Sequence, residues 1–419
     1  MRNDKNIRIF AYMGPIPANW NTHREPDYRN DNYINDEQYG YLKDGGFTGV
    51  IALMERTAEH TESAMQLADK YGLDYYVRDE INWDLNYDPA IFEQKADFYR
   101  KCEAHPSFAG IFITDEPDCS QYPVFAELKT AFDKFFNNKK HGYYINLLPT
   151  YANDVTQLGA PYPEYIQQYI DVVKPDNVCF DHYPFQKRRI NPDTEDDGFY
   201  DYTRTDYFYN MDIVAKACDE ADIEMWTFVQ SKNYVKRETD LTYEAMAFQF
   251  YVSLAYGAKS LVYYTYWTWP GYYASEVDKI FPQAVISAKG ERLERYYHVQ
   301  AIHKEISFFG EEFMKCKHKT SYIVPNGKDD VYFTQVEVKE SDLFKGSEAT
   351  LVGEFADENG NKAYMLVNAV DPYVGKTDEV KCNLKGCTVY DRNEKLHKDG
   401  EFTVTLKPGQ GVFITMDKE

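Results

Sequence analysis

Short apolar runs alternate with longer amphipathic stretches over roughly the first 300 residues of the chain. The short runs are rich in β-branched and aromatic residues and predict eight strands, at 7–12, 47–53, 73–78, 108–114, 141–147, 177–181, 224–229 and 260–266. The stretches between them predict helices at 36–44, 61–71, 90–102, 122–137, 163–173, 206–221 and 242–256. This alternation is typical of repeated βα units around a parallel sheet.

Glycines stand where several predicted helices give way to the next strand. Gly45-Gly46, Gly72 and Gly257 can adopt the left-handed backbone that ends a helix, which supports the spacing of the units. A further helix is predicted at 291–309. Eight such units predict a (β/α)₈ barrel, and we assign it residues 1–314.

The pattern changes after about residue 315 to short alternating strands separated by turn residues. Strands are predicted at 330–334, 351–355, 363–367 and 411–415, and Asn359-Gly360 is a strong signal for a hairpin. We therefore expect residues 315–419 to form a small antiparallel β-sandwich with a structural role.

The overall charge excludes two classes of partner. The formal net charge is −22 at pH 7 and the longest basic cluster is only Gln186-Lys187-Arg188-Arg189, so the chain should repel nucleic acid and anionic membranes. No apolar run reaches the length that spans a bilayer. We expect neither nucleic acid nor membrane as a partner, and the sequence leaves open whether the chain forms a homo-oligomer.

The cysteines and the start of the chain bear on location. Seven scattered cysteines without metal-binding spacing are typical of reduced core thiols rather than of a disulfide framework. The first residues lack the apolar segment of a signal peptide. The prediction is a cytoplasmic protein, with secretion as the alternative if a signal peptide has been removed.

Acidic and aromatic residues gather where the predicted strands end. In a (β/α)₈ barrel the carboxyl ends of the strands form the reactive face. The fourth strand runs into Asp115-Glu116-Pro117 and the sixth into Asp181-His182-Tyr183. For the Asp-Glu-Pro segment alone, a helix cap followed by a first-turn acid is an equally good explanation. The convergence of several strands favours a site instead.

The other strand ends supply further candidates. Our predicted substrate-binding residues are Glu55, Glu80, Asn146, His182, Tyr183, Trp226, Gln230, Tyr264, Tyr266 and Trp267. Aromatic residues make up 16% of the chain, and their flat faces and polar tips suit the C–H faces and hydroxyls of a sugar. We find neither a glycine-rich phosphate loop nor a set of metal ligands, so we expect a carbohydrate substrate, no cofactor and no metal.

At these positions the sequence resembles the glycoside hydrolases built on (β/α)₈ barrels, in which the acid/base Glu follows the fourth strand. The resemblance covers the barrel pattern, and its motifs are Asp115-Glu116-Pro117, Asp181-His182-Tyr183 and 226–230. It implies that Glu116 is the general acid/base of a hydrolase that cleaves a glycosidic bond.

The seventh strand departs from the pattern of this group. Many retaining members carry a nucleophilic Glu at its end, where this chain has Gln230. One explanation is a similarity to the substrate-assisted β-N-acetylhexosaminidases, in which the acetamido carbonyl of the sugar attacks. Asp115 would then orient the acetamido N–H, and Tyr263, Tyr266 or Gln230 would bind its oxygen.

A two-carboxylate mechanism is the alternative. Asp181 or Glu80 would then act with Glu116, as the nucleophile or as the base that activates water. Asp181 is read equally well as a hydrogen-bond partner of a sugar hydroxyl or of His182.

Two other classes of function stay open. A carbohydrate-binding barrel without catalysis agrees with Gln230 and the aromatic rim, whereas an aldolase or isomerase would need a lysine such as Lys232. The long stretch at 186–206 after the sixth strand predicts a lid or a dimer contact.

Overall fold

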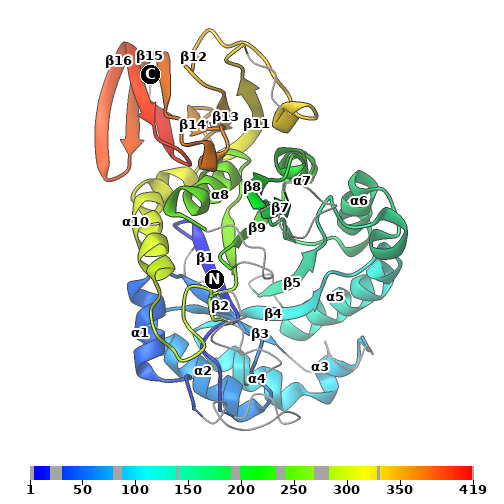
Figure 1. The fold of residues 1–419 in the computed structure, drawn as a ribbon. Helices are drawn as coiled ribbons and strands as arrows, with labels where there is room; N and C mark the ends of the chain where they lie inside the picture. The colour runs from blue at the N-terminus through cyan, green and yellow to red at the C-terminus, as the bar shows by residue number, and fades with distance from the viewer. Residues whose placement is uncertain are drawn as a thin grey trace.

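The computed structural model describes residues 4–18, 31–78, 87–137, 141–189, 199–232, 241–268, 283–327 and 331–417. The chain forms a barrel surrounded by helices, with an antiparallel sheet domain packed against one side (Figure 1). The last barrel helix ends at Met314 and the first strand of the second part begins at Lys317.

Eight parallel strands close the barrel, as the sequence predicted. In order around the barrel they are β1 (Arg8–Tyr12), β2 (Gly49–Ile51), β3 (Asp74–Arg78), β4 (Phe108–Asp115), β5 (Gly142–Leu147), β6 (Asn177–Phe180), β9 (Glu224–Gln230) and β10 (Ser260–Tyr264). Closure pairs Arg8 of the first strand with Ser260 of the last. The carboxyl ends of all eight strands therefore meet at one end of the barrel, which we call the barrel mouth.

The helices cover the outside of the barrel. They are α1 (Asp36–Asp44), α2 (Ala58–Tyr71), α3 (Ile91–Gln94), α4 (Ala96–Ala104), α5 (Tyr122–Phe136), α6 (Tyr162–Val173), α7 (Tyr207–Ala221), α8 (Tyr243–Ala255) and α10 (Glu294–Met314). Side chains of Asn35, Thr57 and Thr242 cap the starts of α1, α2 and α8. The single helix predicted at 90–102 is instead two helices, because the backbone leaves the helical region at Lys95.

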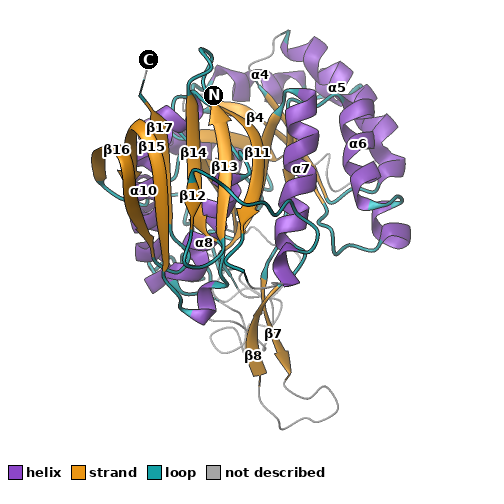
Figure 2. Cartoon of the chain, turned by 90° about the horizontal axis from the view of Figure 1, so that it is seen from above, coloured by secondary structure: helices purple, strands orange, loops and turns teal. Residues whose placement is uncertain are grey.

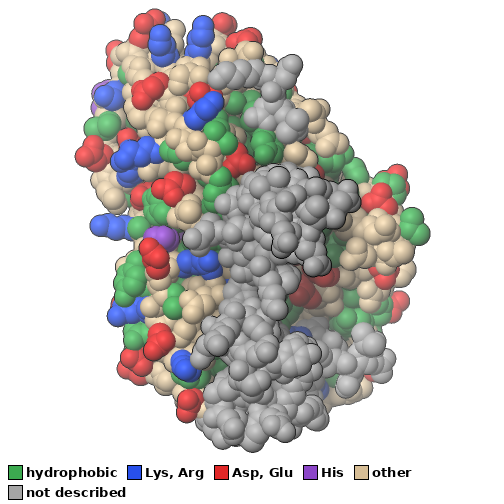
Figure 3. All heavy atoms as spheres, viewed as in Figure 1, with side chains coloured by type: hydrophobic (Ala, Val, Ile, Leu, Met, Phe, Trp, Pro, Cys, Tyr) green, Lys and Arg blue, Asp and Glu red, His purple; other side chains and the backbone are tan. Residues whose placement is uncertain are grey.

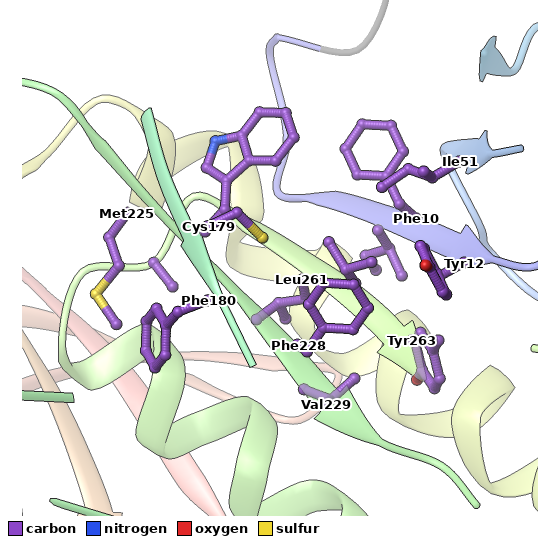
Figure 4. Packing of buried hydrophobic residues seen from close by; sticks show 14 of the residues in the cluster. Phe10, Tyr12, Ile51, Cys179, Phe180, Met225, Phe228, Val229, Leu261 and Tyr263 are labelled. Atoms are coloured by element: carbon purple, nitrogen blue, oxygen red, sulfur yellow. The ribbon is translucent and has the colours of Figure 1, made fainter. Parts of the chain in front are cut away.

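Aromatic rings fill the inside of the barrel (Figure 4). Phe10 stacks on Trp226, with ring centroids 5.5 Å apart, and Tyr76 and Tyr144 each lie 6.0 Å from the same indole. These four rings come from alternate strands, which is the layered packing typical of such barrels. The layer is a closed floor below the barrel mouth.

Small residues make room for this floor. A Cβ atom at Gly49 would lie 2.6 Å from the ring of Phe10, and one at Gly142 would lie 2.3 Å from the hydroxyl oxygen of Tyr76. Any larger side chain at these two strand positions would collide with the rings.

The C-terminal part is a β-sandwich made by one antiparallel sheet that folds over itself. Its strands are β11 (Lys317–Val324), β12 (Phe344–Lys345), β13 (Thr350–Ala356), β14 (Lys362–Asn368), β15 (Asp378–Asp391), β16 (Glu394–Leu406) and β17 (Gly411–Met416). The pairing of β15 shifts between Leu384 and Cys387, so one half of the strand pairs with β12 and the other half with β17. Such an irregularity bends a strand and lets it serve two layers.

Two sequence predictions for this part are resolved by the structure. The Asn359-Gly360 hairpin is confirmed, since it joins β13 to β14 and Gly360 has φ +81. The strand predicted at 330–334 is wrong, because Val331–Phe333 is a single turn of 3₁₀ helix. A run of three apolar residues cannot distinguish a short strand from such a turn.

Helix α8 lies between the barrel and the sandwich, with β9 on one side and β13 and β14 on the other. It is buried on every face from Ala245 to Ala255, in agreement with its almost wholly apolar sequence. The sandwich comes close to both ends of this helix. A Cβ atom at Gly353 of β13 would lie 2.1 Å from the carbonyl oxygen of Ala255, and one at Gly409 would lie 2.0 Å from that of Glu244.

The segment predicted as a lid or dimer contact contains a hairpin of β7 (Phe185–Arg189) and β8 (Phe199–Thr203). Figure 2 shows it projecting from the body of the molecule. On the face in Figure 3, the described Lys and Arg side chains are interspersed with Asp and Glu. Among the helices that the structure describes, none has both the length and the apolar character needed to cross a bilayer.

The junction at Gly353 yields a test of the packing. Replacing Gly353 with Ala should lower the free energy of unfolding by about 1–3 kcal/mol, because the new methyl group meets a backbone carbonyl that cannot rotate away. Denaturant unfolding measures this change.

The matched control is Gly40→Ala in α1, where the nearest atom to a new Cβ would be 3.6 Å away. This change should stabilise the protein by up to about 1 kcal/mol, since Ala is the better helix former. Equal effects of the two substitutions would contradict the close packing at the junction.

Candidate active site

Three acidic residues come together at the barrel mouth. Asp115 is the last residue of β4, Glu116 follows it, and Asp181 follows β6. Glu116 has a left-handed backbone with φ +51, and its N–H donates to the carbonyl oxygen of Asn146 on the neighbouring strand β5 at 2.9 Å. A non-glycine residue in this conformation is uncommon and concentrates at functional sites.

The side-chain amide of Asn146 links two of these carboxyl groups. Its nitrogen donates to Asp115 Oδ1 at 2.9 Å and to Asp181 Oδ1 at 3.1 Å. The hydroxyl of Tyr12 on β1 donates to Asp115 Oδ2 at 3.1 Å, and Tyr183 forms a side-chain hydrogen bond with Asp181. Asp115 is therefore held from two sides.

The three carboxyl groups differ in their access to solvent. Asp181 is buried, with 3% of its surface exposed. Asp115 and Glu116 keep accessible surface, although protein atoms surround them closely enough for desolvation to dominate their ionisation. A ligand in the barrel mouth can therefore reach Asp115 and Glu116 but not Asp181.

Their pKa values are all shifted upward. Desolvation is the largest cause for Glu116 and the charge of Asp115 adds to it, which raises the pKa of Glu116 to about 7, while a hydrogen bond with Asp181 acts in the opposite direction. Desolvation followed by repulsion from Glu116 and Asp115 raises the pKa of Asp181 well above its ordinary value. The group therefore retains a proton near neutral pH, and Glu116 is the member from which a ligand can take it.

Asp115 has one further electrostatic partner. Burial raises its pKa, whereas the hydrogen bonds from Asn146 and Tyr12 and the positive charge of Arg78 lower it. Arg78 ends β3, donates to the carbonyl oxygen of Leu53 at 3.1 Å and lies 5.6 Å over the ring of Phe112. Its fixed charge favours the ionised form of Asp115 next to a protonated Glu116.

Aromatic side chains line the mouth beside the acids. Tyr264, at the end of β10, lies 5.2 Å from the ring of Tyr183 and stacks on Tyr12 at 6.0 Å. The ammonium group of Lys232 lies 5.0 Å from the centre of the Tyr264 ring. Tyr183 and Tyr264 are thus brought together with the acids as the sequence suggested, and Tyr12 is an addition.

Tyr151 is a further residue that the sequence reasoning missed. Its pKa is raised by burial and by the charges of Asp181 and Glu116, which places its hydroxyl close to the acids, and the hydroxyl bonds to the backbone of Tyr183. The guanidinium of Arg204 lies 4.0 Å from the ring centre, and 37% of the Tyr151 surface remains exposed. The only sequence signal was its position after the fifth strand.

His182 is fully buried behind this tyrosine. Its ring packs between Tyr151 and Tyr207, and its Nε2 lies 3.4 Å from Asp206 Oδ1. Burial lowers the pKa of His182, so the ring stays neutral near pH 7. His182 supports Tyr151 from below and has no surface that a ligand could touch.

Three predicted binding residues are engaged with the protein itself. Glu55 accepts hydrogen bonds from the backbone N–H groups of Leu53 and Met54 and from the hydroxyl of Tyr75. The amide of Gln230 is paired with the backbone N–H and carbonyl of Phe185. Trp226 lies in the aromatic floor and donates to Glu224 at 2.9 Å.

Two further predicted binding residues are buried, and a third is not among the residues that the structure describes. Tyr266 packs against Phe47 and Trp267 against Tyr33, and both are fully buried. Tyr263, a candidate for the acetamido oxygen, bonds instead to His303 at 2.6 Å. Glu80 lies outside the described residues.

Within the described part of the chain, no group of three His, Cys, Asp or Glu side chains is arranged to hold a metal ion. All seven cysteines are described and all are free thiols. The barrel mouth therefore presents to a ligand the protonated carboxyl group of Glu116, the carboxylate of Asp115 in a fixed orientation, and aromatic rings.

Solved structures share this architecture. A family 5 glycoside hydrolase from Bacteroides vulgatus ATCC 8482 has a TM-score of 0.54 at 13% sequence identity, over 98% of this chain and 89% of that one. The β-galactosidase from Bacillus circulans sp. alkalophilus has a TM-score of 0.56 at 9% identity, over the full length of both chains. The fold is that of these two enzymes. No protein-family model and no curated protein matches the chain.

The raised pKa of Glu116 should make the stability of the protein depend on pH. Between about pH 4.3 and about pH 7 the folded state holds a proton on Glu116 that the unfolded state has released, so stability falls as pH rises through this window. Glu116→Gln removes the cost of ionising this group. The variant should therefore gain melting temperature over the parent at about pH 8 and lose that advantage at about pH 4.

Differential scanning calorimetry at both pH values measures the effect. Glu127→Gln on the exposed side of α5 is the control and should give the same small difference at each pH. A Glu116→Gln protein with no pH-dependent gain would show that Glu116 ionises as an ordinary surface carboxyl group.

Proposed function

We propose that this protein is a glycoside hydrolase in which Glu116 is the general acid/base. The supporting observation is a ligand-accessible carboxyl group with a pKa raised to about 7, placed at the carboxyl ends of the barrel strands. A general acid works best when its pKa lies near the working pH, because it is then protonated and still a good donor.

The surroundings of Glu116 support a sugar as the substrate. The exposed ring of Tyr151 and the partly exposed ring of Tyr264 present flat apolar faces, and the acids present hydrogen-bond acceptors. The two solved structures compared above, which have TM-scores of 0.54 and 0.56, are named as enzymes that act on glycosides. At 9–13% identity this naming supports the proposal only through the shared fold.

Access to the acids favours the substrate-assisted mechanism. Asp115 and Glu116 are the accessible pair, and Asp115 is fixed by Asn146 and Tyr12 in a position from which it can accept an N–H bond. Asp181 has only 3% of its surface exposed. Asp181 also forms a hydrogen bond with Glu116. The two catalytic carboxyl groups of a retaining glycosidase lie farther apart than a hydrogen bond, at roughly 5–5.5 Å, so Asp181 is poorly placed to be the nucleophile.

The reaction would then follow two steps on a 2-acetamido sugar. The acetamido oxygen attacks the anomeric carbon, the glycosidic C–O bond breaks, and the proton of Glu116 passes to the departing oxygen. Asp115 accepts the acetamido N–H and stabilises the positive charge that develops on the ring intermediate. Glu116, now ionised, takes a proton from the water that opens this intermediate.

The residues that bind the acetamido oxygen must differ from the first expectation. Tyr263 and Gln230 are committed to His303 and to the backbone of Phe185, and Tyr266 is fully buried. Tyr264 is partly exposed at the mouth and stacks on Tyr12, next to Asp115. We assign the acetamido contact to Tyr264.

Hydrolysis of matched aryl β-glycosides with and without a 2-acetamido group tests this mechanism. Cleavage should be restricted to the 2-acetamido sugars. Glu116→Gln should lower kcat by roughly 10²- to 10⁴-fold, with a smaller loss on an aryl group acidic enough to leave without a proton. Asp115→Asn should impair both kinds of aryl group equally, because its role does not involve the leaving oxygen.

Glu127→Gln, on the outside of α5, serves as the control and should keep parental activity. Cleavage of plain hexosides, with Asp181→Asn inactive, would replace the proposal with a two-carboxylate mechanism. Sugar binding without turnover on any substrate would make the protein a carbohydrate-binding barrel.

Tyr151 supplies a separate prediction on binding. Tyr151→Ala should raise KM about three- to tenfold, because the exposed ring is lost as a platform for the sugar. Tyr151→Phe keeps the ring but loses the hydroxyl bond to Tyr183, so its KM should stay near that of the parent. Steady-state kinetics separate the two, and equal KM increases would show that the hydroxyl rather than the ring matters.

A further inference from the structure

A second hollow lies on the surface where the start of α1 meets the segment that leads into α10. It has a volume of about 450 Å³. Hydrogen bonds from Tyr296 to the carbonyl of Tyr41, and from Gln300 to that of Asp44, hold the two helices together beside it (Figure 1). We call it the α1–α10 pocket, and none of its lining residues belongs to the acidic site described above.

Aromatic rings and one guanidinium group form much of its lining. Tyr33, Tyr41 and Tyr297 line the pocket, and 51% of the Tyr297 surface is exposed. Arg292 lies 4.5 Å from the ring centre of Tyr41 and 5.8 Å from that of Tyr297. Stacking of this kind holds the rings and the cation in place before any ligand arrives.

A buried polar atom in the lining lacks a partner. Gln38 is 2% exposed, and its amide nitrogen donates to the carbonyl oxygen of Gly290 at 2.9 Å. The amide oxygen of Gln38 has no hydrogen-bond partner. Buried acceptors are nearly always satisfied, by protein, water or ligand, so this oxygen indicates a place for a donor such as a hydroxyl group or a bridging water.

The charges around the pocket cancel. Glu37 and Glu291 line the pocket together with Lys289 and Arg292. An anionic ligand would meet as many carboxylates as cations, and the same holds for a cationic ligand. A neutral ligand with hydroxyl groups and apolar faces fits this lining best.

The pocket adjoins the loops of the barrel mouth. Its residue Tyr33 packs against Trp267, with ring centroids 4.9 Å apart, and Trp267 follows the eighth barrel strand. The backbone N–H of Trp267 bonds to the carbonyl oxygen of Met13, which follows the first strand. The pocket and the acidic site therefore open at the same end of the barrel.

We propose that the α1–α10 pocket binds a neutral sugar unit of an oligosaccharide and forms a second carbohydrate site beside the barrel mouth. The choice of a sugar as its ligand rests on the proposed function. The exposed ring of Tyr297 is the platform for the sugar face, and the glutamates and Arg292 supply hydrogen bonds to its hydroxyls.

Direct binding to oligosaccharides tests the pocket without relying on turnover. Calorimetric titrations would use neutral β-linked tetrasaccharides of glucose, galactose, mannose and N-acetylglucosamine, with Glu116→Gln protein so that none is consumed. For at least one of them, adding Tyr297→Ala should weaken binding about three- to tenfold, which is the effect expected of one stacked ring. Adding Arg292→Ala should weaken the binding of the same tetrasaccharide.

Phe308→Ala is the matched control, because Phe308 is an exposed aromatic residue on the same helix that does not line the pocket. It should leave the affinity unchanged. The proposal that the α1–α10 pocket binds a sugar would be contradicted if Glu116→Gln protein bound every tetrasaccharide equally well with and without Tyr297→Ala. It would also be contradicted if the protein bound none of them.

Kinetics with the active enzyme separate this proposal from the proposed hydrolase. Tyr297→Ala alone should leave kcat and KM unchanged on a short aryl glycoside, which reaches only the barrel mouth. Tetrasaccharide binding that depends on Tyr297, without any hydrolysis, would support sugar binding by the α1–α10 pocket and contradict the proposed hydrolase activity. Hydrolysis together with a tetrasaccharide affinity that does not depend on Tyr297 would support the hydrolase activity and contradict sugar binding by the pocket.

Discussion

The amide nitrogen of Asn146 donates to both Asp115 and Asp181, and the character of the barrel mouth depends on this pair of hydrogen bonds. They link the aspartate at the end of β4 to the aspartate that follows β6. Desolvation raises the pKa values of all three acids, and repulsion adds to it for Glu116 and Asp181, whereas the two bonds lower the pKa of the aspartates that accept them. Glu116 is the accessible member, and its pKa is raised to about 7. The barrel closure supplies this arrangement, because it places the ends of β4, β5 and β6 side by side.

The same closure explains the depth of the site. Rings from alternate strands, including Phe10 and Trp226, close the barrel interior, so a ligand can enter only from the mouth. On the outside, α8 joins this barrel to the sandwich through close contacts of its backbone with Gly353 and Gly409. The sandwich therefore packs against one side of the barrel, on the outer face of α8.

The order of the barrel strands and helices follows from the sequence, because glycines and helix caps mark their ends. The orientation of single side chains does not. Trp226 belongs to the floor rather than the mouth, since its depth along β9 depends on how the strands are staggered. Gln230 reaches the mouth, but the backbone of Phe185, distant in sequence, occupies its amide. Tyr12 was missed because a tyrosine among apolar residues gives no sign of what its hydroxyl contacts, and Tyr151 because its only signal was its position after the fifth strand.

The ionisation of Glu116 is the most direct test of this account. Protein labelled with ¹³C at Asp and Glu carboxyl groups would be titrated by NMR, and the Glu116 resonance identified by its absence in Glu116→Gln. The account predicts a midpoint of about 7, and a lower midpoint in Asp115→Asn, because the neighbouring negative charge is removed. A midpoint near the ordinary value of about 4.3, unchanged in Asp115→Asn, would contradict it.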